Sequence, residues 1–93
     1  MITSIVMISC DVSRIPEVAE ALASQDGVSE VYSVAGNADL IAIVRVPHFD
    51  DVAEVIAGSI SKTPGVVNTE TYIAFRAYSR HDLEATFAIG LGD

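Results

Sequence analysis

Apolar residues, many of them β-branched, gather in four short runs along the chain, and turn-forming residues separate the runs. Runs of this kind, bounded by Gly, Pro, Asn or Asp, are typical of β-strands. The pattern therefore predicts strands over residues 2–10, 28–35, 40–46 and 66–78. Only four residues, Gly36-Asn37-Ala38-Asp39, separate the second strand from the third, and their composition is that of a turn. These two strands should therefore form a hairpin.

Apolar residues recur at helical spacing between the first and second strands, and again between the third and fourth. Pro16 suits the first turn of a helix, Gly27 is placed to end it, and Thr63-Pro64-Gly65 ends the second segment. Each segment is therefore predicted to be an amphipathic helix. The two apolar stripes are Ile15, Val18, Ala19, Leu22 and Ala23 in the first helix, and Val52, Val55, Ile56, Ser59 and Ile60 in the second.

The predicted order of elements is β-α-β-β-α-β. Two right-handed βαβ units joined by a hairpin give a four-stranded antiparallel sheet with both helices on one face. This is the ferredoxin-like split βαβ fold, of class α+β. A faint internal repeat agrees with two halves of similar build, because Glu30-Val31-Tyr32 in the second strand recurs as Glu70-Thr71-Tyr72 in the fourth.

The sheet face away from the helices is also apolar in this sequence, whereas a solvated face would alternate with polar residues. In the third strand Leu40, Ala42, Val44 and Val46 take one side and Ile41 and Ile43 take the other, so both faces are largely apolar. Burying a large apolar side chain is worth about 1.5–3 kcal/mol, so we expect this face to pack on a second copy. The result would be a homodimeric α/β sandwich or barrel. The alternative is that the tail, residues 79–93, folds back over the face.

The charge balance argues against nucleic acid and anionic membranes as partners. The chain of 93 residues carries 13 Asp plus Glu against 5 Lys plus Arg, a formal net charge of −8, and the cations are scattered. Nucleic-acid binding draws most of its affinity from cations placed against phosphates. The single cysteine, Cys10, cannot form an internal disulfide and is expected to be a small buried hydrophobe. With no basic leader and no run long enough to span a bilayer, we expect one cytoplasmic domain.

Two segments resemble a known family. The hairpin resembles the V-x-G-x-x-D-hydrophobic segment of the Lrp/AsnC family, with Val34, Gly36 and Asp39 at the motif positions. The fourth strand resembles that family's P-G-V-x-x-T-x-T segment, since residues 64–71 read Pro-Gly-Val-Val-Asn-Thr-Glu-Thr. The resemblance covers residues 1–78 and is to the family's C-terminal effector domain, the RAM domain (regulation of amino-acid metabolism). Full-length members place a helix-turn-helix domain before it, so this chain looks like a stand-alone version.

The resemblance implies a dimer whose sheets face each other, and dimers that assemble into rings, commonly octamers. It also implies small-ligand sites between dimers, near the Gly-x-x-Asp turn, with free amino acids as the usual ligands. The chain is accordingly interpreted as one RAM-type ligand-binding domain over residues 1–78. Residues 79–93, with Leu83 and Phe87 at helical spacing, are expected to form a tail that packs on the domain or on a neighbouring protomer.

The turn offers both kinds of partner that an amino acid needs. A ligand carboxylate can accept hydrogen bonds from backbone N–H groups, and an ammonium group can bind a carboxylate. Gly36 permits a close approach to the backbone, and Asp39 supplies a negative charge. The candidate ligand-binding residues are Gly36, Asn37, Ala38 and Asp39, with Val34 or Tyr32 as pocket lining and Thr69 and Thr71 as sources of hydroxyl groups. The alternatives are ordinary hairpin chemistry, with Asp39 bonded to its own backbone, and threonines that only favour strand structure.

Other chemistry has no support in the sequence. His48 and His81 lack metal-ligand spacing, and the sequence has no recognisable Ser-His-Asp set or phosphate loop. We therefore expect no enzyme, no cofactor and no metal. The leading hypothesis is an oligomeric regulatory domain that binds a small effector, a free amino acid above all, without its own DNA-binding domain. One alternative is an assembly partner that co-oligomerises with full-length Lrp/AsnC regulators and binds no ligand. Another is a small dimeric α+β barrel enzyme.

Overall fold

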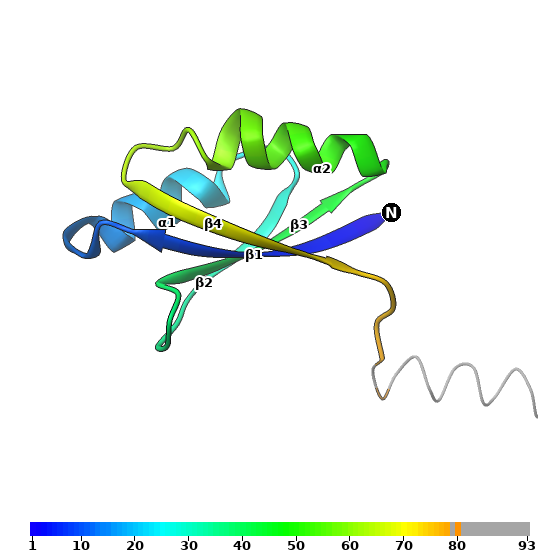
Figure 1. Ribbon diagram of the computed structural model, residues 1–93, viewed down its shortest axis with the longest axis horizontal. Coiled ribbons are helices and arrows are strands. Elements are labelled where there is room, and N and C mark those ends of the chain that lie inside the picture. Colours follow the sequence, from blue (N-terminus) through cyan, green and yellow to red (C-terminus); the bar gives the residue numbers. More distant parts are fainter. Residues whose placement is uncertain (79, 81–93) are drawn as a thin grey trace, which may run out of the picture.

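The computed structural model describes residues 1–78 and residue 80. Within this part of the chain, four strands and two α-helices follow the predicted order, which confirms the ferredoxin-like α+β fold (Figure 1). None of the described helices is long and apolar enough to cross a membrane. The elements are β1 (Ile2–Cys10), the 3-10 helix η1 (Val12–Arg14), α1 (Ile15–Ala23), β2 (Val28–Ser33), β3 (Leu40–Val46), α2 (Phe49–Val55), the π-helical η2 (Ile56–Ile60) and β4 (Val66–Ala74).

The strands form one sheet in the order β2-β3-β1-β4, and every neighbouring pair is antiparallel. Figure 1 shows α1 and α2 on the same side of this sheet. Because β1 and β3 are central, β2 and β4 are edge strands with one neighbour each. The C-terminal end of β1 consequently lies between the β2–β3 turn, residues 34–39, and the start of β4.

Alternate residues of the central strands pack with the two helical stripes to form the core. Val18 and Leu22 are buried on α1, and Val52 and Ile60 are buried on the second helical segment, as the predicted stripes require. Burial at about 1.5–3 kcal/mol for each large side chain makes this cluster the main source of stability. The buried members of the core are Val6, Ile8, Cys10, Val18, Leu22, Leu40, Ala42, Val44, Val46, Val52 and Ile60.

Gly65 lets the start of β4 approach α1 closely. Its φ is +96°, a conformation that residues with side chains rarely adopt, and a Cβ atom there would lie 2.6 Å from Cγ2 of Val18. The carbonyl oxygen of Gly65 accepts a 2.9 Å hydrogen bond from the backbone N–H of Asp11. The glycine therefore joins the end of β1, the side of α1 and the start of β4 at one point.

β4 is shorter than the sequence pattern predicted. The predicted strand extends to residue 78, but β4 ends at Ala74. Among the described strands β4 pairs only with β1, which begins at Ile2, and the last pair in this ladder joins Thr3 to Ala74. Residues 75–78 have no strand from the described part of the chain beside them with which to continue the ladder, and the chain leaves the sheet here (Figure 1).

β2 also ends early, at Ser33 rather than at residue 35, because its last pair with β3 joins Ser33 to Leu40. The second predicted helix is present in two parts. α2 gives way to η2, where the N–H of Ser61 donates to the carbonyl oxygen of Ile56 at 2.8 Å, a wider turn than that of an α-helix. The apolar stripe nevertheless continues through both parts and stays on the core side.

The sheet face opposite to the helices has an apolar centre. Its half-buried central residues are Ile5, Met7, Ile41 and Ile43. No helix among the described residues lies over this open face (Figure 1). The predicted tail helix with Leu83 and Phe87, and the alternative in which the tail covers this face, lie outside the described residues. Packing on a second copy therefore stays a prediction.

Candidate functional site

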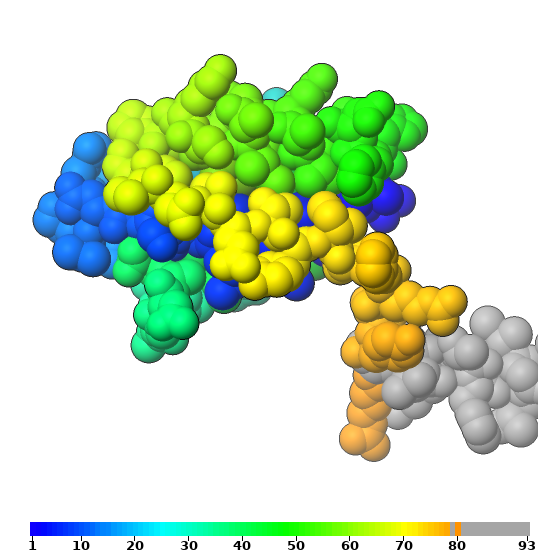
Figure 2. Space-filling view, viewed as in Figure 1, coloured from blue at the N-terminus to red at the C-terminus, as the bar shows by residue number. Residues whose placement is uncertain are grey.

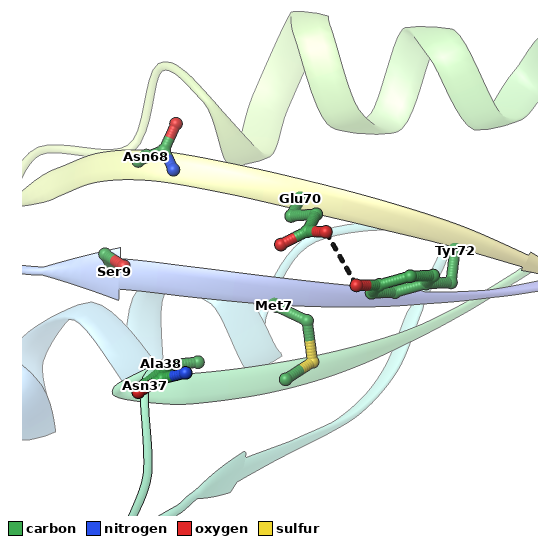
Figure 3. A pocket seen from close by; sticks show the side chains of 7 residues that line it. All are labelled: Met7, Ser9, Asn37, Ala38, Asn68, Glu70 and Tyr72. Carbon is green, nitrogen blue, oxygen red and sulfur yellow. Dashed lines mark hydrogen bonds between the residues drawn. The ribbon is translucent and has the colours of Figure 1, made fainter.

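A hollow of about 190 Å³ opens at one end of the open face, beside the β2–β3 turn. Two strands and the turn contribute its walls (Figure 3). The lining residues are Met7 and Ser9 of β1, Asn37 and Ala38 of the turn, and Asn68, Glu70 and Tyr72 of β4. The hollow therefore joins three segments that are far apart in the sequence.

Strand register explains why β1 and β4 share this hollow. Ser9 pairs with Asn68, and Met7 pairs with Glu70. Paired residues of neighbouring strands project from the same side of a sheet, and residues two apart on one strand do so too. Tyr72 therefore joins Glu70 on the open face, and in Figure 3 the ring of Tyr72 lies over β1 while the side chain of Glu70 lies between β4 and β1.

Asp39 holds the turn against the end of β1. Its backbone N–H donates to the carbonyl oxygen of Ile8 at 2.9 Å, and its carboxylate oxygen Oδ2 accepts a 2.9 Å hydrogen bond from the N–H of Cys10. The second bond falls where the β1–β4 ladder shifts register, between Ser9 and Cys10. The carboxylate thus binds the neighbouring strand and not the backbone of its own turn. Asp39 is not among the residues that line the hollow.

Cys10 has the environment of a structural thiol. Burial raises the pKa of this thiol, and the negative charges of Asp39 and Asp11 raise the pKa further. The sulfur is therefore protonated near neutral pH and packs within the core. Within residues 1–78 and residue 80, no three His, Cys, Asp or Glu side chains are grouped to hold a metal ion.

Glu70 is the one charged residue among the seven that line the hollow. Its Oε1 accepts a 2.6 Å hydrogen bond from the hydroxyl group of Tyr72 (Figure 3). This hydrogen bond, and then the charge of Glu70, raise the pKa of the Tyr72 phenol. The amides of Asn37 and Asn68 and the hydroxyl group of Ser9 add donors and acceptors. One carboxylate, several neutral polar groups and no cation favour a small ligand with an ammonium group.

The structure brings part of the predicted site into this hollow. Asn37 and Ala38 line it, as expected of the turn. Gly36 precedes them with a φ of +146°, and no atom lies within 4 Å of the place where its Cβ atom would stand. This glycine therefore leaves open space next to the turn backbone, which a ligand can enter. Asp39 acts one step away, by fixing the position of the turn.

The other predicted site residues lie elsewhere. Thr69 and Thr71 pair with core residues of β1, so they share the helix-covered face of the sheet and project away from the hollow. Tyr32 lies on the open face but on the far edge strand, and its hydroxyl group donates to Glu30. Neither Tyr32 nor Val34 is part of the lining.

Sequence reasoning missed the lining residues that the strands supply, which are Met7, Ser9, Asn68, Glu70 and Tyr72. A usable signal was present, because the internal repeat already marks Glu70 and Tyr72. Thr69 and Thr71 of the motif alternate along the strand with Glu70 and Tyr72, so the two pairs face opposite sides of the sheet. To decide which pair lines a site, one must know which side of the sheet each pair faces. The strand register supplies that information and the sequence motif alone does not.

A family model described as the Lrp/AsnC ligand binding domain matches residues 3–83. The matched range holds the four strands except for Ile2, the first residue of β1, together with both helices and the complete lining of the hollow.

Individual proteins agree with this match. An uncharacterized HTH-type transcriptional regulator of Pyrococcus furiosus is 36% identical over 59 residues, which are 63% of this chain and 39% of that protein. This chain therefore matches about two fifths of the curated relative's length. A solved structure from Thermus thermophilus is 42% identical with a TM-score of 0.80, over 86% of this chain and 100% of that chain. A transcriptional regulator of Neisseria meningitidis, solved as a complex with L-Met, shares the fold at 9% identity, with a TM-score of 0.76 over 85% of this chain and 53% of that chain.

Proposed function

We propose, from the premise that the chain belongs to the Lrp/AsnC ligand-binding domain family, that it binds a small effector with an ammonium group. A free amino acid fits this description best. The observation that carries the proposal is the hollow where the Gly-x-x-Asp turn meets the single carboxylate of Glu70. Its volume of about 190 Å³ lies below the ~300–1,000 Å³ of pockets for drug-sized ligands, which suits a small metabolite.

The lining residues suggest how an amino acid would bind. The ammonium group would donate to the carboxylate of Glu70, since charge-assisted hydrogen bonds are about twice as strong as neutral ones. The ligand carboxylate would accept from the amide groups of Asn37 and Asn68 or from the hydroxyl group of Ser9. Met7 would contact the apolar part of the ligand. The Neisseria regulator, which shares this fold, was solved as a complex with L-Met, and this supports an amino acid as the class of ligand.

We also propose that the open face packs on a second copy of the chain, and that dimers join into a ring. The apolar centre of the face favours such a contact. Tyr32 and Tyr72 stand on the open face with 50% and 52% of their surface exposed, and tyrosine is enriched at interfaces. The hollow opens at the end of this face. A neighbouring chain could therefore reach it and supply the cation that the lining lacks.

The test is a thermal unfolding screen of the purified protein against the free amino acids. Ligand at about 100 times its Kd adds ~2.7 kcal/mol to the free energy of unfolding. Each kcal/mol raises the Tm of a domain of this size by roughly 4–8 °C. We expect a selective rise with one amino acid or a few related ones. A flat panel would contradict the effector role and would leave assembly, including co-assembly with full-length regulators, as the function to examine by pull-down.

A further inference from the structure

A second hollow, of about 340 Å³, lies at the opposite end of the open face. It forms where β1 begins and β4 ends, and Figure 2 shows the chain turning away from the body of the molecule after β4. The lining residues are Met1, Thr3, Arg45, Ala74, Phe75, Arg76 and Ala77. This hollow shares no lining residue with the first one.

Arginine side chains line the second hollow, whereas a carboxylate lines the first. The whole chain has 5 Lys plus Arg, yet Arg45 and Arg76 both line this one hollow, and none of its described lining residues carries a carboxylate. Strand register brings the two arginines to the same end of the sheet. Arg45 of β3 pairs with Thr3 of β1, Thr3 pairs with Ala74 of β4, and Arg76 follows two residues later.

An ion pair with Glu30 holds the guanidinium group of Arg45 in place. Its Nη1 lies 2.9 Å from Oε1 of Glu30 in an ion pair, and Glu30 also accepts a hydrogen bond from the hydroxyl group of Tyr32. A guanidinium group has five N–H donors, so this ion pair leaves most of them available. Because Glu30 balances the charge of Arg45, Arg76 gives the hollow its net positive charge.

An apolar wall accompanies the cations. The side chain of Phe75 is 97% exposed next to the hollow, and Ala74 and Ala77 complete this side. Aromatic rings and guanidinium groups together suit a carboxylate that is attached to an apolar body, since the guanidinium group can form two parallel hydrogen bonds to a carboxylate. A free ammonium group on the same ligand would be repelled by the positive charge of Arg76.

We propose that this second hollow binds a small organic carboxylate without an ammonium group, through Arg45 and Arg76, with the apolar body of the ligand against Phe75. The class comprises aromatic or branched aliphatic carboxylates, 2-oxo acids among them. The two ends of one sheet face would then sort ligands by charge, with amines at Glu70 and carboxylates at the arginines. This assignment rests on the second hollow alone and does not depend on the amino-acid site.

The experiment compares phenylacetate with benzylamine, two probes with the same ring and opposite charge, by NMR titration of the full chain. Phenylacetate should move the amide signals of Thr3, Arg45 and Ala74. Arg76→Gln should weaken phenylacetate binding about tenfold, because it removes charge-assisted hydrogen bonds. Lys62→Gln is the matched control, with the same loss of charge outside the hollow, and should leave the affinity unchanged.

Several results would overturn the proposal. The first is that phenylacetate does not bind at millimolar concentration. The second is that Arg76→Gln binds phenylacetate with the same affinity as the wild type. The third is that phenylacetate moves only the amide signals of residues around the hollow with Glu70. A fourth is a change in the dimer fraction of Arg76→Gln with no probe bound, because a carboxylate of a second copy would then be the partner of Arg76. Glu70→Gln separates the two sites. It should leave phenylacetate binding intact even if the amino-acid site proves wrong.

Discussion

Asp39 shows how a motif residue can serve a site that it does not line. Its backbone N–H and its carboxylate each make a 2.9 Å hydrogen bond to β1, at Ile8 and at Cys10. These bonds fix the turn so that Asn37 and Ala38 form one wall of the first hollow. Asp39 therefore acts by holding the turn in position, and we expect folding to depend on its oxygen acceptor.

Two substitutions at Asp39 separate its oxygen from its charge. Asp39→Ala leaves the half-buried N–H of Cys10 without its acceptor, which should cost about 1–3 kcal/mol of the free energy of unfolding. Asp39→Asn keeps an oxygen acceptor in the same place and should cost less than about 1 kcal/mol. Urea unfolding of the two variants checks the prediction, and equal losses in both would show that the charge itself is required.

Gly65 gives a second prediction at the residue scale. Gly65→Ala combines an unfavourable φ of +96° with a Cβ atom 2.6 Å from Val18, and should destabilise the fold by more than about 1 kcal/mol. Gly58 is the control, since it has no such φ and no atom within 4 Å of its Cβ position. Gly58→Ala should raise stability by about 0.4–1 kcal/mol. Similar midpoints of denaturation for the two alanine variants would refute this account.

At the scale of elements, the sequence predicts whether a segment is a helix or a strand better than it predicts where that segment ends. β1 and β3 have the predicted bounds because each is a central strand with a partner along both sides. β2 and β4 stop at Ser33 and Ala74, before their apolar runs end, because an edge strand is limited by the length of its one neighbour. An apolar run shows what can form a strand, whereas the end of the strand depends on pairing that the local sequence does not contain.

The edge strand β2 is joined to β3 by an ion pair that should make stability depend on pH. Hydrogen bonds from Tyr32 and then from Arg45 lower the pKa of Glu30 below its ordinary value of 4.5. A carboxylate whose folded pKa is lowered stabilises the fold above the unfolded pKa, and this contribution is lost as the pH falls through the folded pKa. The stability advantage of the wild type over Glu30→Gln should therefore shrink below pH 4.5. An advantage that is independent of pH would contradict the role of the charge.

At the scale of the whole molecule, the open face combines an apolar centre with two hollows of opposite charge at its ends. The apolar centre was predictable, because both alternating sets of residues in the central strands are apolar. The hollows were not, since each collects residues from strands that are adjacent in the sheet and distant in the sequence. The pairing of β4 with β1 is what identifies Glu70 and Tyr72 as residues of the site.

The proposed dimer gives a prediction at this scale. Ile5 lies at the half-buried centre of the open face, where it pairs with Ile43 and with Tyr72. Ile5→Asp would place an unpaired charge in the interface and should convert the dimer to monomer, as measured by analytical ultracentrifugation. Val67→Asp is the control, because Val67 is 77% exposed in the irregular part of β4. A dimer that persists in Ile5→Asp would exclude this face as the contact.

The most direct measurement of the central claim is calorimetric titration of the wild type and of Glu70→Gln with the amino acid that the thermal screen selects. Glu30→Gln is the matched control, since the internal repeat places the same residue on the opposite edge of the face, outside the first hollow. We predict that Glu70→Gln binds about tenfold or more weakly, because the ammonium group loses its charged partner, and that Glu30→Gln binds as the wild type does. Unchanged affinity in Glu70→Gln would contradict the assignment of this hollow as the effector site.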